Sequence, residues 1–417
     1  MLAIEKNWNN SAAALQVVVF KRGASAPAVS DSGPRARNHQ DMVDKCRASS
    51  GTFQPPPVSR LRIHMVKESM MAKEMKVSSD IGYQNYSAEG RENHFSVMRP
   101  EEEWIQPVPE GAHYEWTETS MFGFNIPEHG IDCIIYYWHH PALSVTYGGL
   151  IIWRGQNGNQ VACDYSDYRS VMPLPDDITN CTYANGVTVR MIKPLEEFHI
   201  TFDDPPYETS LDLHLKAIMP PACRYNGGHI TQAMKTSGEL VLSGERFKID
   251  GYHTRDRSWN EARSEVIRKT PPLNWTVGVF DDDFAFHHCS FDSRRYHPEW
   301  GDNFSGNGDD NNCLWGYIYE NGETHGVAHV DQQTTRGPDG IAPMAVRTVI
   351  TATNGRDYVI TGKAISSTPV MAWPNMAAHF VLFEWECEGR KAKGHGDIQM
   401  VIYRDAYRMM DKATPKQ

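Results

Sequence analysis

The chain has 417 residues, a formal net charge of −11, and 11 Trp, 18 Tyr and 15 Phe. That length predicts two or three domains and a core that needs no disulfide or metal to fold. No run approaches the roughly 18 to 20 apolar residues of a membrane span, and the acidic balance is unlike that of a general nucleic-acid binder. We therefore expect no stable membrane insertion and no nucleic-acid partner.

The first part of the chain differs in composition from the rest. Residues 1–76 hold 12 Lys/Arg against 6 Asp/Glu, whereas the remaining residues carry a net charge of −17. Tracts such as the three prolines at 55–57 cannot bury enough apolar surface to offset their ordering entropy. The apolar run at 15–20 is too short for a signal peptide, and its basic pair follows it. We expect residues 1–95 to be a disordered basic leader and linker, with a transit peptide or a later start as alternatives.

The eight cysteines form no C-x-x-C pair, and their spacings are irregular. In a chain of this length without a secretory signal, such cysteines are typical of reduced thiols that pack as small hydrophobes. We therefore expect a cytoplasmic protein without structural disulfides.

From about residue 110 the sequence consists of short β-type runs separated by turn residues. Residues 187–191 and 211–215 alternate apolar and polar side chains, which is typical of half-buried strands. Asn-Gly pairs at 321–322 and 354–355 favour tight hairpins. The only helix we expect is a short one near 403–412. The pattern predicts an all-β fold of two antiparallel barrel or sandwich domains, at 96–240 and 241–410, with a boundary in or near 232–248.

The densest polar cluster lies at residues 251–265 and follows two predicted strands. If the second strand continues, alternation places His253, Arg255 and Arg257 on one face and Tyr252, Asp256 and Ser258 on the other. An Asp between two Arg residues is typical of an anchoring carboxylate, because the cations favour its charged form. The competing interpretation is an Arg–Asp lattice that fixes the strand, with Trp259 filling the core.

The run G-x-H-x-R-D-R-S-W at 251–259 resembles the G-x-G-x-R-D-(H/R)-S-W-G signature of a lipocalin-like superfamily. That superfamily includes carotenoid 1,2-hydratases (hydroxyneurosporene synthases), fungal Diels–Alderase-like cyclases and two-domain bacterial proteins of unknown function. The segment 116–119 before an aromatic strand, and the Gly-rich segment 394–397, also resemble these proteins. The chain departs from the signature at His253, which replaces a common Gly, at Asn260, which stands where Gly usually follows Trp, and at Arg263, which sits one place late.

The resemblance implies two lipocalin-like antiparallel β-barrel or sandwich domains with a hydrophobic ligand at their interface or in a barrel mouth. It also implies acid-assisted hydration of a C=C bond or cyclisation of a polyene. Such chemistry needs a proton donor, aromatic faces that stabilise positive charge, and controlled entry of water. The candidate catalytic residues are Asp256 as the acid or its anchor, Glu118 as a second acid, and His253. The candidate substrate-binding residues are Tyr252, Arg255, Arg257, Trp259, Trp116, His287 and His288.

The other polar patterns point to no metal or cofactor. A zinc site at His287 and Cys289 would share one strand face, but no second ligand pair has metal-like spacing. The oxygen-rich loops at 281–283 and 306–312 lack the twelve-residue calcium frame, so we interpret them as hairpin tips. No P-loop, dinucleotide fingerprint or hydrolase elbow occurs.

The leading hypothesis is a cofactor-independent lyase or isomerase of hydratase/cyclase type, acting on an apolar alkene such as an isoprenoid or polyketide. A non-catalytic binder of hydrophobic small molecules is the first alternative, and a carbohydrate-active β-sandwich is the second. The only partner that we expect is a hydrophobic small-molecule substrate, and a homodimer is left open.

Overall fold

The structure is a computed structural model that describes residues 95–225, 227–262, 270–293, 295–300, 312–371 and 376–413. The predicted leader, apart from its last residue, lies outside the described residues. So do Arg263 and all but the last residue of the predicted loop at 306–312.

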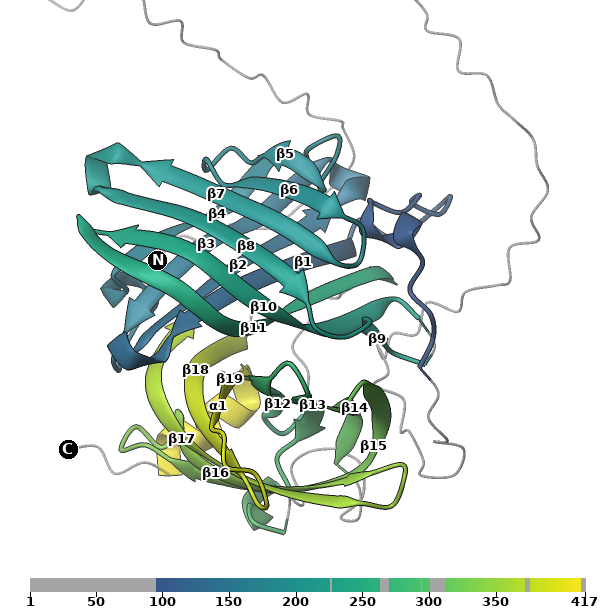
Figure 1. Cartoon of the computed structure of the whole chain (residues 1–417), viewed down its shortest axis with the longest axis vertical. Coiled ribbons are helices and arrows are strands. Elements are labelled where there is room, and N and C mark those ends of the chain that lie inside the picture. Colours follow the sequence, from purple (N-terminus) through teal and green to yellow (C-terminus); the bar gives the residue numbers. More distant parts are fainter. Residues whose placement is uncertain are drawn as a thin grey trace, which may run out of the picture. The chain divides into compact units, whose positions relative to one another are not determined.

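The first half of the described chain forms one large antiparallel sheet (Figure 1), whose order is β4-β3-β2-β1-β11-β10-β8-β7-β6-β5, with β9 paired to β10. Its strands are β1 (Trp116–Ile126), β2 (Ile131–His140), β3 (Val145–Arg154), β4 (Tyr165–Pro173), β5 (Asn180–Thr182), β6 (Thr188–Lys193), β7 (Glu197–Asp204), β8 (Thr209–Ala217), β9 (Ala222–Cys223), β10 (His229–Leu242) and β11 (Glu245–Ala262).

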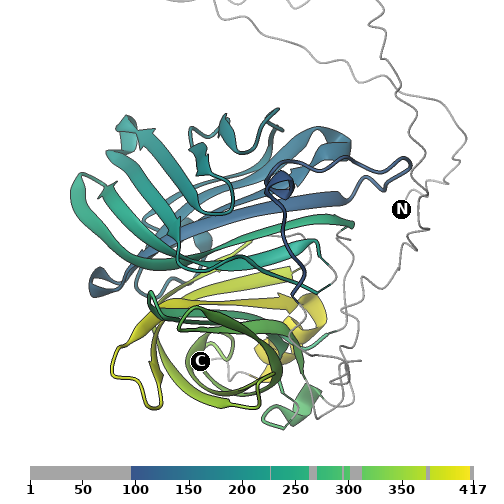
Figure 2. The same cartoon turned by 45° about the vertical axis from the view of Figure 1, so that its right-hand side comes forward.

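The second half forms a closed eight-stranded barrel (Figure 2), in which β12 to β19 pair in chain order. The elements are β12 (Leu273–Asp281), β13 (Phe284–Phe291), β14 (Cys313–Glu320), β15 (Glu323–Arg336), β16 (Pro343–Ala352), β17 (Asp357–Val370), β18 (Met376–Cys387), β19 (Gly394–Tyr403) and the helix α1 (Arg404–Ala413). Since β19 pairs with β12, closure leaves the barrel without a free edge.

The all-β prediction with two antiparallel β-structures is confirmed, and the meander order of the closed barrel is that of lipocalin-like barrels. The expected boundary at 240/241 falls inside β10. The hairpin partner of β10, β11, pairs with both β10 and β1, so it belongs to the first sheet. The tight turn of this hairpin uses Ser243 and Gly244, both at positive φ, as a primed turn requires. The barrel begins only at β12.

Alternation along the strands gives each structure a core of its own. Phe122, Phe124 and Leu213 belong to the core of the first sheet, and Phe286, Phe383 and Ile398 belong to that of the barrel. A third apolar layer joins the two structures. We call this layer the seam, and it consists of Met121, Ile134, Tyr136, Trp138, Ile151 and Trp153 of the sheet with Val370, Ala378 and Phe380 of the barrel. In the part of the chain that is described, no helix is long and apolar enough to span a membrane.

Candidate functional site

Strand β11 carries the motif at 251–259 through the middle of the first sheet, between β1 and β10. Because successive strand residues point to opposite faces, Arg255 and Arg257 share one side and Asp256 takes the other. The two arginines therefore contact partners other than Asp256. This corrects the expectation that they tune its carboxylate.

Arg255 is buried in a bidentate ion pair with Glu103. Its Nη1 and Nη2 donate to the two Glu103 oxygens at 3.0 and 2.8 Å, and its Nε donates to Gln232 Oε1 at 2.6 Å. The guanidinium also lies 4.7 Å from the centre of the Phe198 ring. These three hydrogen bonds join Arg255 of β11 to Glu103 and to Gln232 of β10, so they fix Glu103 against the first sheet.

Arg257 pairs with Glu118, the second predicted acid, through a single hydrogen bond. Its Nη2 donates to Glu118 Oε2 at 2.7 Å, and the other Glu118 oxygen accepts the Gln106 amide at 2.8 Å. Burial raises the pKa of Glu118, and the opposing effect of Arg257 does not cancel the rise. Both oxygens are thus occupied, which suits an anchor for the segment around Gln106.

Two predicted binding residues belong to this anchoring region. The Trp259 ring lies 5.9 Å from the Arg257 guanidinium and packs with Met98 and Ile230. Trp116 is buried at the start of β1. This face of β11 therefore matches the competing interpretation of the motif, in which paired charges fix the strand and Trp259 fills the core. The arginines pair with Glu103 and Glu118, however, and not with an Asp.

The other face of β11 presents Asp256 to the barrel side. His229 Nε2 lies 2.9 and 3.1 Å from the two Asp256 oxygens, and the Thr231 hydroxyl donates to the carboxylate at 3.0 Å. The imidazole of His229 stacks on Trp275 of the barrel at 4.8 Å between centroids. Asp256 thus holds His229 against an aromatic wall.

His287 completes this group, which we call the Asp256 cluster (Asp256, His229, Trp275, Trp315 and His287). Its ring lies 4.5 Å from Trp275 and 4.8 Å from Trp315. Burial lowers the pKa of His287 well below its usual value, so the ring is neutral at pH 7. Nδ1 is 3.0 Å from the Thr276 carbonyl, and Nε2 has no hydrogen-bond partner among the described residues. Trp275 and Trp315 are half-buried.

Two further predicted residues lie apart from this cluster. His288, next to His287, points to the opposite face of β13, where its Nδ1 is 3.1 Å from Ser290 Oγ. Burial lowers the pKa of His288 to about 3. The Tyr252 hydroxyl donates to Asp282 Oδ1 at 2.9 Å.

His253 lies between two buried carboxyl groups that the sequence analysis did not identify. His253 Nε2 is 3.2 Å from Asp397 Oδ2 of β19 and 3.9 Å from Asp132 Oδ1 of β2. All three side chains are at most 1 % exposed. We call them the acid cluster. A Cβ on Gly123 would lie 2.4 Å from His253 Cε1, so the histidine ring requires a glycine at position 123.

The electrostatics of the acid cluster favour bound protons. Burial, followed by the charge of Asp397, raises the pKa of Asp132 well above its usual range. Burial alone would lower the pKa of His253, but Asp397 and the Thr254 carbonyl together raise it above its usual value. Apart from one another, Asp132 Oδ2, His253 Nε2 and both Asp397 oxygens meet no hydrogen-bonding group within the described ranges. The cluster therefore places two buried carboxyl groups beside an imidazole, and its surroundings favour the protonated forms of Asp132 and His253.

Aromatic side chains adjoin the acid cluster. Trp153 lies directly opposite Asp132 in the β2–β3 pair, and its ring meets Phe380 of the barrel edge to face at 6.4 Å. The seam continues to the Asp256 cluster. Gln399 donates to Met121 Sδ at 3.2 Å, Met121 pairs with Asp256, and Gln399 pairs with Trp275. The acid cluster and the Asp256 cluster thus lie along the same seam.

Each acidic residue missed by the sequence analysis had a signal. Asp132 is the only charged residue in the apolar run 131–138, and Asp397 closes the Gly-rich segment that resembles the superfamily. A carboxylate in a fully apolar strand is rare unless it is paired, so Asp132 could have been singled out. Its partners come from distant strands, and only the fold reveals them.

Two groups in the described part of the chain have the geometry of metal ligands. They are the acid cluster and a group on the first sheet, formed by His199, Asp212 and His214. The expectation that the protein uses no metal and no cofactor stays a prediction.

The family model described as "Domain of unknown function (DUF7064)" matches residues 99–402. The chain belongs to this family. None of the curated proteins matches the chain. Among solved structures, the chain is similar to kievitone hydratase from Nectria haematococca at 13 % identity and a TM-score of 0.44, covering 75 % of this chain and 97 % of that one. It is also similar to CghA, at 10 % identity and the same coverage, with TM-scores of 0.42 for CghA and 0.44 for CghA with Sch210972.

Proposed function

We propose that the protein is a lyase or isomerase of hydratase/cyclase type that protonates a C=C bond of an apolar substrate, such as an isoprenoid or polyketide. Asp132 is the proton donor in this proposal, with Asp397 and His253 as its partners. The observation that carries it is a buried group of two carboxyls and an imidazole, in which Asp132 lies directly opposite a tryptophan.

Protonating an alkene requires an undissociated acid in a dry environment. A carboxyl group with an ordinary pKa is ionised at pH 7, whereas burial and the neighbouring Asp397 raise the pKa of Asp132 and favour its neutral form. Trp153 lies opposite Asp132 and contacts Phe380, and such aromatic rings can stabilise developing positive charge. The buried acid and the aromatic rings supply two of the three requirements of acid-assisted hydration or cyclisation, and the third is controlled entry of water.

The Asp132 proton is transferred to one alkene carbon, and the π pair forms the new C–H bond, which leaves a carbocation on the other carbon. In a hydration, water adds to the cation and loses a proton. In a cyclisation, a second C=C bond of the substrate attacks the cation and a C–H proton is lost. Asp132 takes the released proton back, either directly or through His253 and Asp397, so the acid is restored.

Asp256 then has the role of an anchor rather than the acid. Its carboxylate is bonded by His229 and Thr231, and it holds the imidazole on Trp275. The Asp256 cluster adds aromatic surface and the unpaired Nε2 of His287, which suits the binding of a substrate that is apolar with one polar group.

The two alternative functions make different demands. A non-catalytic binder needs the apolar seam but not the neutral acid. A carbohydrate-active enzyme needs two carboxylates roughly 5 to 9.5 Å apart across an open cleft. Asp132 and Asp397 are fully buried and offer ligand atoms within 4.8 Å of one another, which disfavours the carbohydrate function for this pair.

The test uses farnesol and squalene as isoprenoid alkenes in heavy water. Proton transfer from an exchanged Asp132 places deuterium on carbon, which mass spectrometry detects. We expect Asp132→Asn to lower this incorporation by about 10²- to 10⁴-fold, the usual effect of losing a general acid. Asp256→Asn is the matched variant, and a smaller loss is expected. Binding of either alkene without deuterium incorporation in the wild type would favour the binder instead.

A further inference from the structure

A second cluster of chemically active side chains lies on the first sheet, outside the seam, on the neighbouring strands β7 and β8. His199 of β7 lies directly opposite His214 of β8 in the antiparallel pair. Asp212 precedes His214 by two residues and therefore points to the same face. The three side chains are 28 %, 57 % and 61 % exposed for His199, His214 and Asp212, so solvent reaches all of them.

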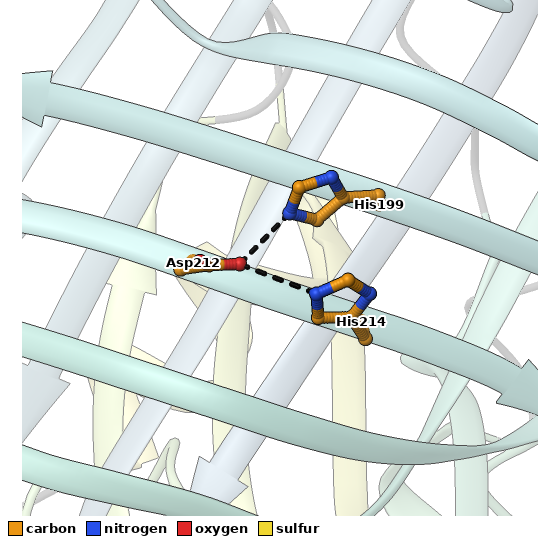
Figure 3. A group of neighbouring side chains, drawn as sticks. All are labelled: His199, Asp212 and His214. Carbon is orange, nitrogen blue, oxygen red and sulfur yellow. Dashed lines mark hydrogen bonds and ion pairs between the residues drawn. The ribbon is translucent and has the colours of Figure 1, made fainter.

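The two imidazoles are arranged in parallel and converge on one oxygen (Figure 3). Their ring centroids are 4.1 Å apart with 7° between the planes. His199 Nε2 lies 2.8 Å from Asp212 Oδ1, and His214 Nε2 lies 3.5 Å from the same atom. The same nitrogen of each histidine thus faces the same carboxylate oxygen, and the ligand atoms all lie within 4.8 Å of one another.

We propose that His199, Asp212 and His214 form a binding site for a divalent transition-metal ion of the zinc type. Zinc binds imidazole nitrogen and carboxylate oxygen at about 2.0 to 2.2 Å, which places tetrahedral ligand atoms about 3.3 Å apart. The two nitrogen–oxygen separations bracket that value. Because the two imidazole planes are nearly parallel, each ring must also turn about its Cβ–Cγ bond so that both Nε2 lone pairs point at one ion. Two imidazoles select zinc, nickel or copper over magnesium and calcium, which prefer oxygen ligands.

The backbone beneath the site is fixed. Ile200, Leu213 and Leu215, which alternate with the three ligands, are buried in the core of the first sheet. Two cations flank the site, and each has a partner of its own. Arg190 donates to Asn180, and Lys216 lies 3.6 Å from Glu197. Three ligands on a rigid sheet leave the remaining coordination positions of the metal to water or to a further group. The site is independent of the proposed chemistry at the seam.

The experiment is calorimetric titration of Zn²⁺ into the untagged full-length chain, freed of metal with a chelator. We expect one Zn²⁺ per chain and a loss of affinity of at least about tenfold in His199→Asn and in His214→Asn. His113→Asn is the matched control, because His113 is exposed and lies 3.2 Å from Glu115 without a second imidazole facing it across a strand pair. Its affinity should equal that of the wild type.

Co²⁺ provides a second readout, since its visible spectrum reports ligand geometry. We expect a tetrahedral spectrum in the wild type and in His113→Asn that both ligand variants lack, with far-UV circular dichroism unchanged in all four proteins. Failure of the wild type to bind Zn²⁺ would overturn the proposal. Binding of equal strength in His199→Asn and His214→Asn would also overturn it, because the ion would then lie elsewhere, for example on the cysteines.

Discussion

His253 Nε2 lies 3.2 Å from Asp397 Oδ2, although the histidine belongs to the first sheet and the aspartate to the barrel. This contact places His253, a residue of the motif at 251–259, in the acid cluster with Asp132. Breaking such a contact leaves a buried charge without compensation. A substitution at this contact, in the sheet or in the barrel, should therefore disturb both the seam and the acid cluster.

Gly123→Ala tests whether His253 can keep its position only because residue 123 has no side chain. The new Cβ would meet His253 Cε1 at 2.4 Å and the Cys133 carbonyl at 2.6 Å. We expect a loss of about 1 to 3 kcal/mol in the free energy of unfolding and a loss of turnover, because the ring must move. Urea unfolding measures the first effect. Gly158→Ala is the control, since nothing lies within 4 Å of a Cβ there, and an equal loss in both variants would contradict this account.

The pH dependence of stability tests the raised pKa of Asp132. The folded state holds this proton to a higher pH than the unfolded state, whose value is near 3.8. The stability contributed by the protonated group is therefore present at low pH and lost as the pH rises through the folded pKa, by up to about 1.4 kcal/mol per pH unit. Asn imitates the protonated carboxyl, so Asp132→Asn should remove this contribution to the slope. If the free energies of unfolding of the wild type and of Asp132→Asn differ by the same amount from pH 4 to pH 9, the pKa of Asp132 is not raised.

His288 gives a dependence of the opposite sign. Its folded pKa is about 3, against 6.5 for the free group, so the unfolded state binds the extra proton first as the pH falls. Stability should decrease from about pH 6.5 downwards, again by up to about 1.4 kcal/mol per pH unit. His288→Gln should show a flatter curve between pH 6 and pH 4 in urea unfolding. If the two curves run parallel, His288 is not neutral and buried.

The Arg255–Glu103 pair tests the anchoring role of the motif. Removing one partner leaves a buried charge, so Arg255→Met should cost about 3 to 5 kcal/mol. The double variant Arg255→Met/Glu103→Met removes both charges and should recover much of that loss. A double-mutant cycle by chemical denaturation measures the coupling, and purely additive losses would show that the pair contributes no anchoring.

Much of the fold could be predicted from the sequence, because strand alternation and turn residues are local signals. The pattern at 211–215 lies within β8, and the Ser-Gly turn closes the β10–β11 hairpin. The predicted boundary at 240/241 lies inside β10 instead, since the pairing of β11 with β1 is a long-range contact that no local pattern encodes.

The candidate site was harder to predict. Alternation along β11 placed Arg255 and Arg257 opposite to Asp256, yet the proximity of these residues in sequence suggested that they act together. Their partners, Glu103 and Glu118, come from segments far along the chain. The acid cluster requires β2, β11 and β19 at once, so the sequence signals of Asp132, His253 and Asp397 could not show that these residues meet.

The most direct test of the central claim is the infrared spectrum of the protonated carboxyl group. We predict a carboxylic-acid carbonyl band at pH 7 in the wild type that disappears in Asp132→Asn and persists in Asp256→Asn. A wild-type spectrum without such a band, or a band of equal intensity in the wild type and in Asp132→Asn, would contradict the role of Asp132 as the proton donor.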